Sequence, residues 1–302
     1  MSILINWTNP LQSADNIVVY RATAPFDMSD LPAVLATLPA TDTEYDDTTA
    51  LLNVVYYYRI GRVVGSDVVL SKQLALSERP STGPGSSSLL RGDYHAGYFG
   101  EVTSDELFTT AGLSSELSFT AGSVAKASPT WRKFIHDGKI KFIPNGGIRA
   151  GIGSWASLYA QGLVYGTDDA GYPAQLTPVN QKRTVTKDGH TYTVRCIKLH
   201  GKASQVLPAV VDKATVQDSE FAELFTRIYD TNQFVGATRW NDLPKLDSVS
   251  IAAAFASQQL LMAGSNNINQ VVALLANGSF TTYGNTGTNT QAAWTPVLEL
   301  ED

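Results

Sequence analysis

Alternating hydrophobic and polar positions run through much of this chain, which is the pattern of half-buried β-strands. The densest example is the segment 53–61, NVVYYYRIG, where β-branched and aromatic residues follow one another. Shorter segments of the same kind at 16–21, 36–38 and 67–70 are separated by turn-forming residues. This regular spacing predicts a small β-sandwich that ends at about residue 77.

Asp-Gly and Asn-Gly dipeptides in the middle of alternating segments predict β-hairpins in the rest of the chain. They lie at 137–138, 188–189 and 277–278. These dipeptides favour type I′ turns, because both central residues of such a turn need positive φ. Helices are fewer, at 154–160 and 218–228, each opened by capping residues. The predicted fold class is therefore mainly β with minor α (α+β).

A stretch rich in Pro, Gly and Ser, ERPSTGPGSSS at 78–88, separates these two parts of the chain. Such a composition buries little apolar surface and is typical of a flexible linker. We therefore expect a β-sandwich at 1–77, the linker at 78–88 and a hairpin-rich domain at 89–302. The last segment, WTPVLEL, alternates again and predicts a strand tied into a sheet, with Trp294 packed inward.

Composition narrows the class of protein. The 302 residues are 43% hydrophobic, which is enough for a buried core, and only 17% charged. The net charge is −6 and Lys and Arg are not clustered, so no nucleic-acid partner is predicted. No apolar run approaches the roughly 20 residues that span a bilayer, so no membrane insertion is expected. The first residues, MSILINW, do not predict a signal peptide.

The residues that usually carry chemistry are sparse. A single cysteine, Cys196, excludes an intramolecular disulfide and a Cys-based zinc cluster, and its strand context predicts a buried thiol. No nucleophile elbow, HExxH motif or phosphate-binding glycine loop is present, so we predict no catalytic residue, metal or cofactor. His136 and His190 adjoin hairpin turns, where solvated side chains are expected. His95 lies among glycines and aromatic residues and fits either a pocket or a contact between domains.

The segment 17–74 resembles fibronectin type III domains. A VYR strand leads to an Asp/Thr-rich strand that contains Tyr45, then to a YYYRI strand and a closing strand. Tyr56 or Tyr58 is similar to the tyrosine of the family's strand F, while Trp7 lies earlier than the family's strand-B tryptophan. The resemblance implies a β-sandwich that acts as a spacer or docking module without catalysis.

The C-terminal part resembles a domain of structural proteins of tailed bacteriophages, and its order of elements is similar to C-type-lectin-like domains. This chain has Thr295 where the family usually has arginine, and Phe221 where it usually has tryptophan. The resemblance is carried by four segments, WRKFIHDGKIKFIP to YGTDDAGYP at 131–173, the hairpin at 177–199, DSEFAELFTRIY at 218–229 and WTPVLEL at 294–300.

These observations predict a non-enzymatic virion structural protein, a component of the tail, the neck or the head decoration. It would form a homo-oligomer and contact other virion proteins, after synthesis in the host cytoplasm. The alternative is a host-receptor or glycan-binding adhesin of the particle, and a weaker one is a hydrolase of cell-wall polysaccharide. The adhesin hypothesis nominates the surface residues Tyr283, Asn285, Thr288, Asn289 and Trp240.

Overall fold

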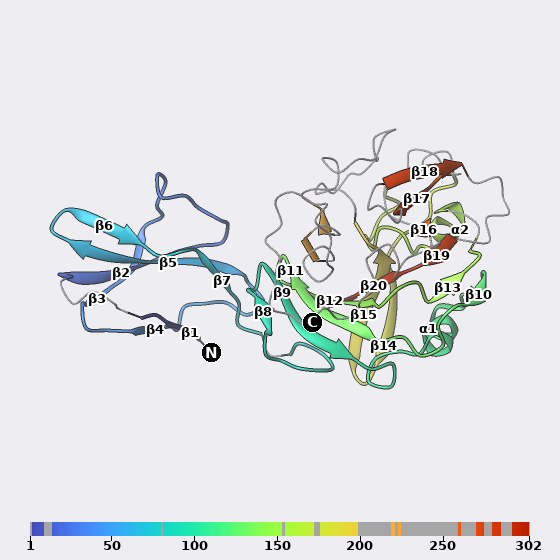
Figure 1. Cartoon of the computed structure of the whole chain (residues 1–302), viewed down its shortest axis with the longest axis horizontal. Helices are drawn as coiled ribbons and strands as arrows, with labels where there is room; N and C mark the ends of the chain where they lie inside the picture. The colour runs from blue at the N-terminus through green and yellow to red at the C-terminus, as the bar shows by residue number, and fades with distance from the viewer. Residues whose placement is uncertain are drawn as a thin grey trace.

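The computed structural model describes residues 2–8, 14–79, 81–152, 155–171, 176–198, 219–220, 223–224, 259–260, 270–274, 280–284 and 292–301. Strands dominate these residues, so the mainly β class is confirmed. Figure 1 shows an N-terminal module and a C-terminal module one after the other along the longest axis. No helix in this part of the chain has the length and apolar character that crossing a membrane requires.

The N-terminal module consists of two facing sheets around a small core. The larger sheet has the order β3-β2-β5-β6, with β7 paired to β5, and the smaller sheet is the antiparallel pair β1–β4. Ile3 and Ile5 of β1 pack with Val19 and two tyrosines of β5. The strands are β1 (Ile3–Asn6), β2 (Asn16–Ala22), β3 (Val34–Pro39), β4 (Glu44–Asp47), β5 (Tyr56–Val64), β6 (Asp67–Leu70) and β7 (Leu74–Leu76).

A seven-stranded sheet with the order β14-β15-β20-β12-β11-β9-β8 forms the centre of the C-terminal module. Smaller sheets have the orders β10-β13-β19-β16 and β17-β18. The elements are β8 (Arg91–Gly92), β9 (Ala96–Val102), α1 (Thr110–Leu117), β10 (Ser123–Val124), β11 (Trp131–His136), β12 (Lys139–Pro144), β13 (Arg149–Ala150), α2 (Trp155–Tyr159), β14 (Arg183–Lys187), β15 (His190–Cys196), β16 (Gln259–Leu260), β17 (Gln270–Leu274), β18 (Phe280–Gly284), β19 (Ala292–Trp294) and β20 (Pro296–Leu300).

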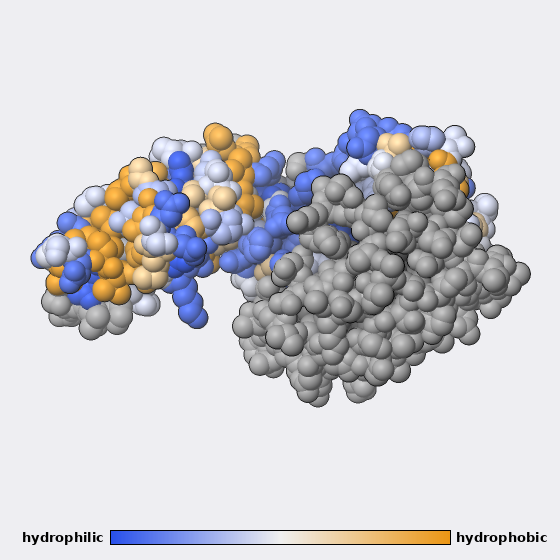
Figure 2. Space-filling view, turned by 90° about the horizontal axis from the view of Figure 1, so that it is seen from above, coloured by the Kyte–Doolittle hydropathy of each residue, from blue (hydrophilic) through white to orange (hydrophobic). Residues whose placement is uncertain are grey.

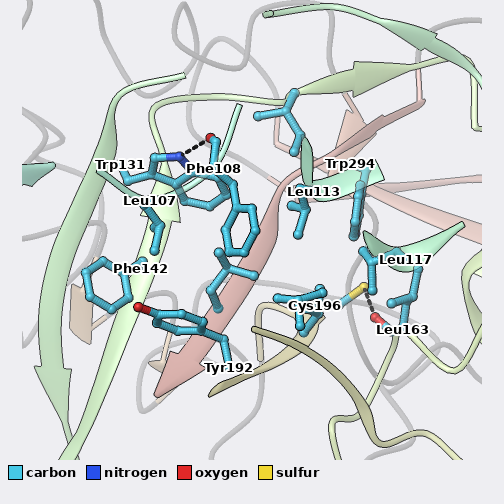
Figure 3. Packing of buried hydrophobic residues seen from close by; sticks show 14 of the residues in the cluster. Leu107, Phe108, Leu113, Leu117, Trp131, Phe142, Leu163, Tyr192, Cys196 and Trp294 are labelled. Carbon is cyan, nitrogen blue, oxygen red and sulfur yellow. Dashed lines mark hydrogen bonds between the residues drawn. The ribbon is translucent and has the colours of Figure 1, made fainter. Parts of the chain in front are cut away.

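The last strand, β20, lies in the middle of the large sheet between β15 and β12, so the prediction of a terminal strand within a sheet is confirmed. One face of this sheet packs on the main hydrophobic core (Figure 3). Trp131 donates its indole N–H to the carbonyl oxygen of Phe108, 2.8 Å away. Trp294 and Cys196 are fully buried in the same core, as predicted.

Two predicted hairpins are present with the expected turns. Asp137 and Gly138 join β11 to β12 with φ of 48° and 73°, and the turn between β14 and β15 has φ of 51° and 83° at Asp188 and Gly189. Positive φ at both central positions is the type I′ geometry that these dipeptides favour. The third predicted hairpin is paired as β17–β18, while its turn at 277–278 lies outside the described residues.

One boundary and one helix differ from the prediction. β5 begins at Tyr56 instead of residue 53, because Asn53 has φ of 59° and therefore belongs to a turn. Helix α1 is not predicted by the sequence pattern, since its glycine and serines weaken the helical signal. It is stabilised by the Thr109 side chain, which accepts the Gly112 N–H at its N-terminus, and by burial of Leu113 and Leu117.

Candidate functional site

Charged side chains cover the face of the large sheet that is turned away from the hydrophobic core. Successive side chains of a strand point to opposite faces of the sheet. Val194 belongs to the core cluster, so its neighbour Arg195 points to the face opposite the core. Lys141 of β12 and Glu299 of β20 are opposite each other in the strand register and share that face. Glu220 is distant from both strands in sequence and forms ion pairs with Lys141 and Arg195 on this face. We call Lys141, Arg195, Glu220 and Glu299 the charged cluster.

The charged cluster is held by short, paired contacts. Arg195 donates from both terminal nitrogens to the two oxygens of Glu220, at 2.8 and 2.6 Å. The same guanidinium lies 2.8 Å from Oε2 of Glu299. Lys141 Nζ lies 2.7 Å from Oε1 of Glu220. The four side chains are at most 12% exposed, so these ion pairs are largely shielded from water.

Opposite charges, and not solvent, keep these groups ionised. Burial alone would raise the pKa of Glu220, yet Arg195 and Lys141 hold it well below its usual range. The same two cations overcome burial at Glu299 and lower its pKa to about 2. Burial alone would lower the pKa of Arg195, but Glu220 and Glu299 raise it above its usual range. Each ion therefore depends on its partners, which makes the cluster sensitive to the loss of any one of them.

A second group of polar side chains continues from the charged cluster to the boundary between the modules. Lys141 Nζ lies 3.0 Å from His136 Nδ1, and His136 Nε2 lies 2.8 Å from Glu223 Oε2. Because an ammonium only donates hydrogen bonds, Nδ1 accepts, and Nε2 carries the hydrogen that is donated to Glu223. His136 is 7% exposed, so the expectation of a solvated side chain is wrong for this residue.

His95 connects this chain of contacts to the N-terminal module. Its Nδ1 lies 3.0 Å from the hydroxyl of Tyr57 in β5 and 3.2 Å from Oδ1 of Asp137, while its Nε2 lies 4.0 Å from Glu223. The hydrogen bond with Asp137 raises the pKa of His95 against the effect of burial. Of the two predicted roles for His95, the contact between modules is therefore the one that its neighbours form.

The segment between the modules is anchored by a buried lysine. Lys133 of β11 is 0% exposed, and its ammonium group donates to the carbonyl oxygens of Gly83, Pro84 and Ser86 at 3.3, 2.9 and 2.7 Å. It also donates to the hydroxyl of Thr82 at 3.0 Å. Burial lowers the pKa of Lys133 to about 8. The boundary at 78–88 stays a prediction, and the structure adds that part of this segment is fixed on the sheet.

The potentially reactive side chains near the charged cluster are paired or buried. The acidic groups of the charged cluster are paired with cations, and the Cys196 thiol is buried with its pKa raised to about 12, which makes it a poor nucleophile. Within the described residues no group of three or more His, Cys, Asp or Glu side chains is placed to hold a metal ion.

An open groove of about 370 Å³ lies elsewhere, between α1 and β14, and includes Asp105, Glu116 and Lys187. Lys187 donates to the Asp105 carbonyl at 2.6 Å, which occupies part of its donor capacity. The groove contributes no side chain to the charged cluster. It therefore stands apart from the polar contacts that reach the module boundary.

No protein-family model matches this chain, and neither does any curated protein. Most of the sequence-predicted contact residues lie outside the part of the chain that the structure describes. Tyr283 lies in β18 with its backbone opposite Val271, but its side chain is not among those described. Asn285, Thr288, Asn289 and Trp240 lie outside the described residues.

Sequence reasoning did not find the charged cluster. A signal was present, because Lys141, Arg195 and Glu299 each lie between apolar neighbours in a predicted strand. Such a residue is ordinarily assigned to a solvent-exposed face, since alternation in a half-buried strand predicts that. The partner Glu220 is distant in sequence, so the pairing that permits burial becomes visible only in three dimensions.

Proposed function

We propose that this chain is a non-enzymatic structural protein of a bacteriophage particle, in which it acts by contacts with other virion proteins. The observation that carries the proposal is the continuous set of polar contacts from Tyr57 through His95, Glu223 and His136 to Lys141. These contacts connect the N-terminal module to the charged cluster of the C-terminal module. A particle component must transmit position and force between its neighbours, and such a connection suits that role.

The domain types are part of the same proposal. A fibronectin III-like assignment of the N-terminal module is supported by the order β3-β2-β5-β6 facing the β1–β4 pair, with Tyr56 and Tyr58 in its core. A C-type-lectin-like assignment of the C-terminal module is supported by the insertion of the final strand, β20, between β15 and β12. Fold alone does not assign a ligand to either module.

Quantitative mass spectrometry of purified particles that encode this chain tests the proposal. We expect the chain at a copy number that is an integer multiple of a particle symmetry, and gold-labelled antibody against it at one position on the particle. Absence of the chain from washed particles refutes the proposal. Glycan-array binding by the recombinant chain would instead support the adhesin alternative, and release of sugar from host polysaccharide would support an enzyme.

A further inference from the structure

The turn that precedes β9 contacts two strands of the N-terminal module. The Tyr94 N–H donates to the carbonyl of Ala75 in β7 at 3.1 Å, and the Ala75 N–H donates to Oδ2 of Asp93 at 3.4 Å. His95, the next residue, lies 3.0 Å from the hydroxyl of Tyr57 in β5. Figure 2 shows hydrophilic residues gathered where the two modules meet. We call Asp93, Tyr94 and His95 the boundary turn, because a displacement of this turn acts directly on the contact between the modules.

Two carboxylates lie on either side of the His95 imidazole. Its Nδ1 is 3.2 Å from Oδ1 of Asp137, in the turn between β11 and β12, and its Nε2 is 4.0 Å from Oε2 of Glu223. A neutral imidazole has one N–H and one lone pair, so one of the two carboxylates faces a lone pair whichever tautomer forms. The imidazolium presents a hydrogen to both carboxylates. The arrangement therefore suits the protonated form of His95.

The neighbouring histidine differs in this respect. His136 lies near the same two carboxylates, with its Nε2 2.8 Å from Glu223 and its Nδ1 3.5 Å from Asp137. Lys141, however, donates a hydrogen bond to Nδ1 of His136 at 3.0 Å, so a proton on that nitrogen would displace the lysine. Of the two histidines, whose ring centroids are 6.2 Å apart, His95 is therefore the one that exchanges a proton.

The other groups around His95 are compatible with the same charge. Asp93 adds a negative charge within the boundary turn, and the Tyr57 hydroxyl oxygen can accept from Nδ1–H. The hydrogen bond to Asp137 raises the pKa of His95 against burial, and the charges of Asp137, Glu223 and Asp93 raise it further. The imidazolium therefore stabilises its surroundings below pH 6.5, and this stabilisation is lost as the pH rises through the raised pKa.

We propose that His95 makes the contact between the modules depend on pH. While the imidazolium is present, Asp137 and Glu223 hold the ring in place, and the boundary turn keeps its contacts with Ala75 and Tyr57. Loss of the proton turns a lone pair towards one carboxylate, and Asp137, whose side chain is 64% exposed, then moves away into water. The boundary turn loses this support, so the contact between the modules opens more often at higher pH.

Hydrogen exchange of the Tyr94 amide in the full chain tests the proposal, because this N–H donates across the module boundary. Between about pH 6 and 8.5 its protection factor should fall, by at most about tenfold per pH unit, which is the limit for one proton. The midpoint of this fall should coincide with that of the His95 imidazole, titrated by NMR. The Ile148 amide, which donates to the Trp294 carbonyl within the C-terminal module, is the internal reference and should keep its protection.

Two variants separate the effect of the proton from a general loss of stability. His95→Gln removes the titrating group, so the Tyr94 protection factor should no longer change over this pH range. Asp137→Asn keeps His95 but removes one carboxylate, so the midpoint of the His95 titration and that of the Tyr94 protection should both move to lower pH. His190→Gln, at the start of β15, is the matched control and should keep the pH dependence of the wild type.

Three results overturn the proposal. They are a Tyr94 protection factor that stays constant or rises with pH in the wild type, a pH dependence that survives His95→Gln, and midpoints that do not move in Asp137→Asn. A rise with pH would mean that Tyr57 donates to a neutral Nδ1 and that the neutral form holds the boundary. The inference goes beyond the proposed function and is measured on the purified chain, so it can fail while the virion assignment stands.

Discussion

Replacing Glu220 by Gln tests whether the charged cluster holds the C-terminal module together. The substitution keeps the side-chain shape but removes the negative charge from between Arg195, at 2.6 and 2.8 Å, and Lys141, at 2.7 Å. Removing one partner from a buried ion pair costs about 3–5 kcal/mol, because the other partner stays buried without compensation. Glu220 serves two cations at once, so we expect a loss of free energy of unfolding in the upper part of this range.

Urea unfolding followed by tryptophan fluorescence measures this loss, since Trp131 and Trp294 are fully buried in the same module. Lys139→Gln is the matched control. It also removes one member of an ion pair with Glu299, at 2.6 Å, but Lys139 is 64% exposed. Exposed pairs contribute about 1 kcal/mol or less. If Glu220→Gln costs no more than Lys139→Gln, the cluster does not stabilise the module and the reasoning is refuted.

Three further predictions follow from the contacts of single residues. Lys133→Met should lower the free energy of unfolding by about 1–3 kcal/mol, because four oxygens lose their hydrogen-bond donor. It should also speed protease cleavage within residues 81–88. Equal cleavage rates in the variant and the wild type would contradict the anchoring role. Tyr57→Phe should lower the free energy of unfolding by about 0.5–1.5 kcal/mol and make the modules tumble more independently in NMR relaxation, because the hydrogen bond to His95 is lost. Tyr58→Phe is the contrast, because the hydroxyl of Tyr58 donates to Asp47 within the N-terminal module. The pKa of Glu299 is lowered from 4.5 to about 2, so its ionised form stabilises the fold above pH 4.5, and this stabilisation is lost as the pH falls towards 2. Glu299→Gln should therefore flatten the fall of the free energy of unfolding, measured in urea, between about pH 4.5 and 2.5. An unchanged slope would contradict this.

Local patterns predicted the elements whose causes are local. The hairpin at Asp137-Gly138 and the one at Asp188-Gly189 follow from turn residues that accept positive φ, and the alternating end of the chain correctly predicts β20. Helix α1 was missed because its stability comes from the Thr109 cap and from burial of Leu113, while its own propensity is weak.

The candidate site could not be predicted in the same way. A lysine or arginine in a strand has the same local pattern whether it faces water or a buried carboxylate. Arg195 is buried only because Glu220 and Glu299 arrive from other parts of the chain. Likewise, His136 has the sequence context of a solvated turn residue, and Lys141 and Glu223 place it inside the protein.

By itself, the sequence determined the mainly β class, the positions of two type I′ turns and the inward packing of Trp294, since each depends on residues that are neighbours along the chain. Only the tertiary structure decided which charged side chains are buried. It also placed the Tyr57 hydroxyl against His95 and the Lys133 ammonium against the segment between the modules. The physical reason is that burying an ion is favourable only when its partner is in place. That partner is supplied by the fold, from residues tens to more than a hundred positions away.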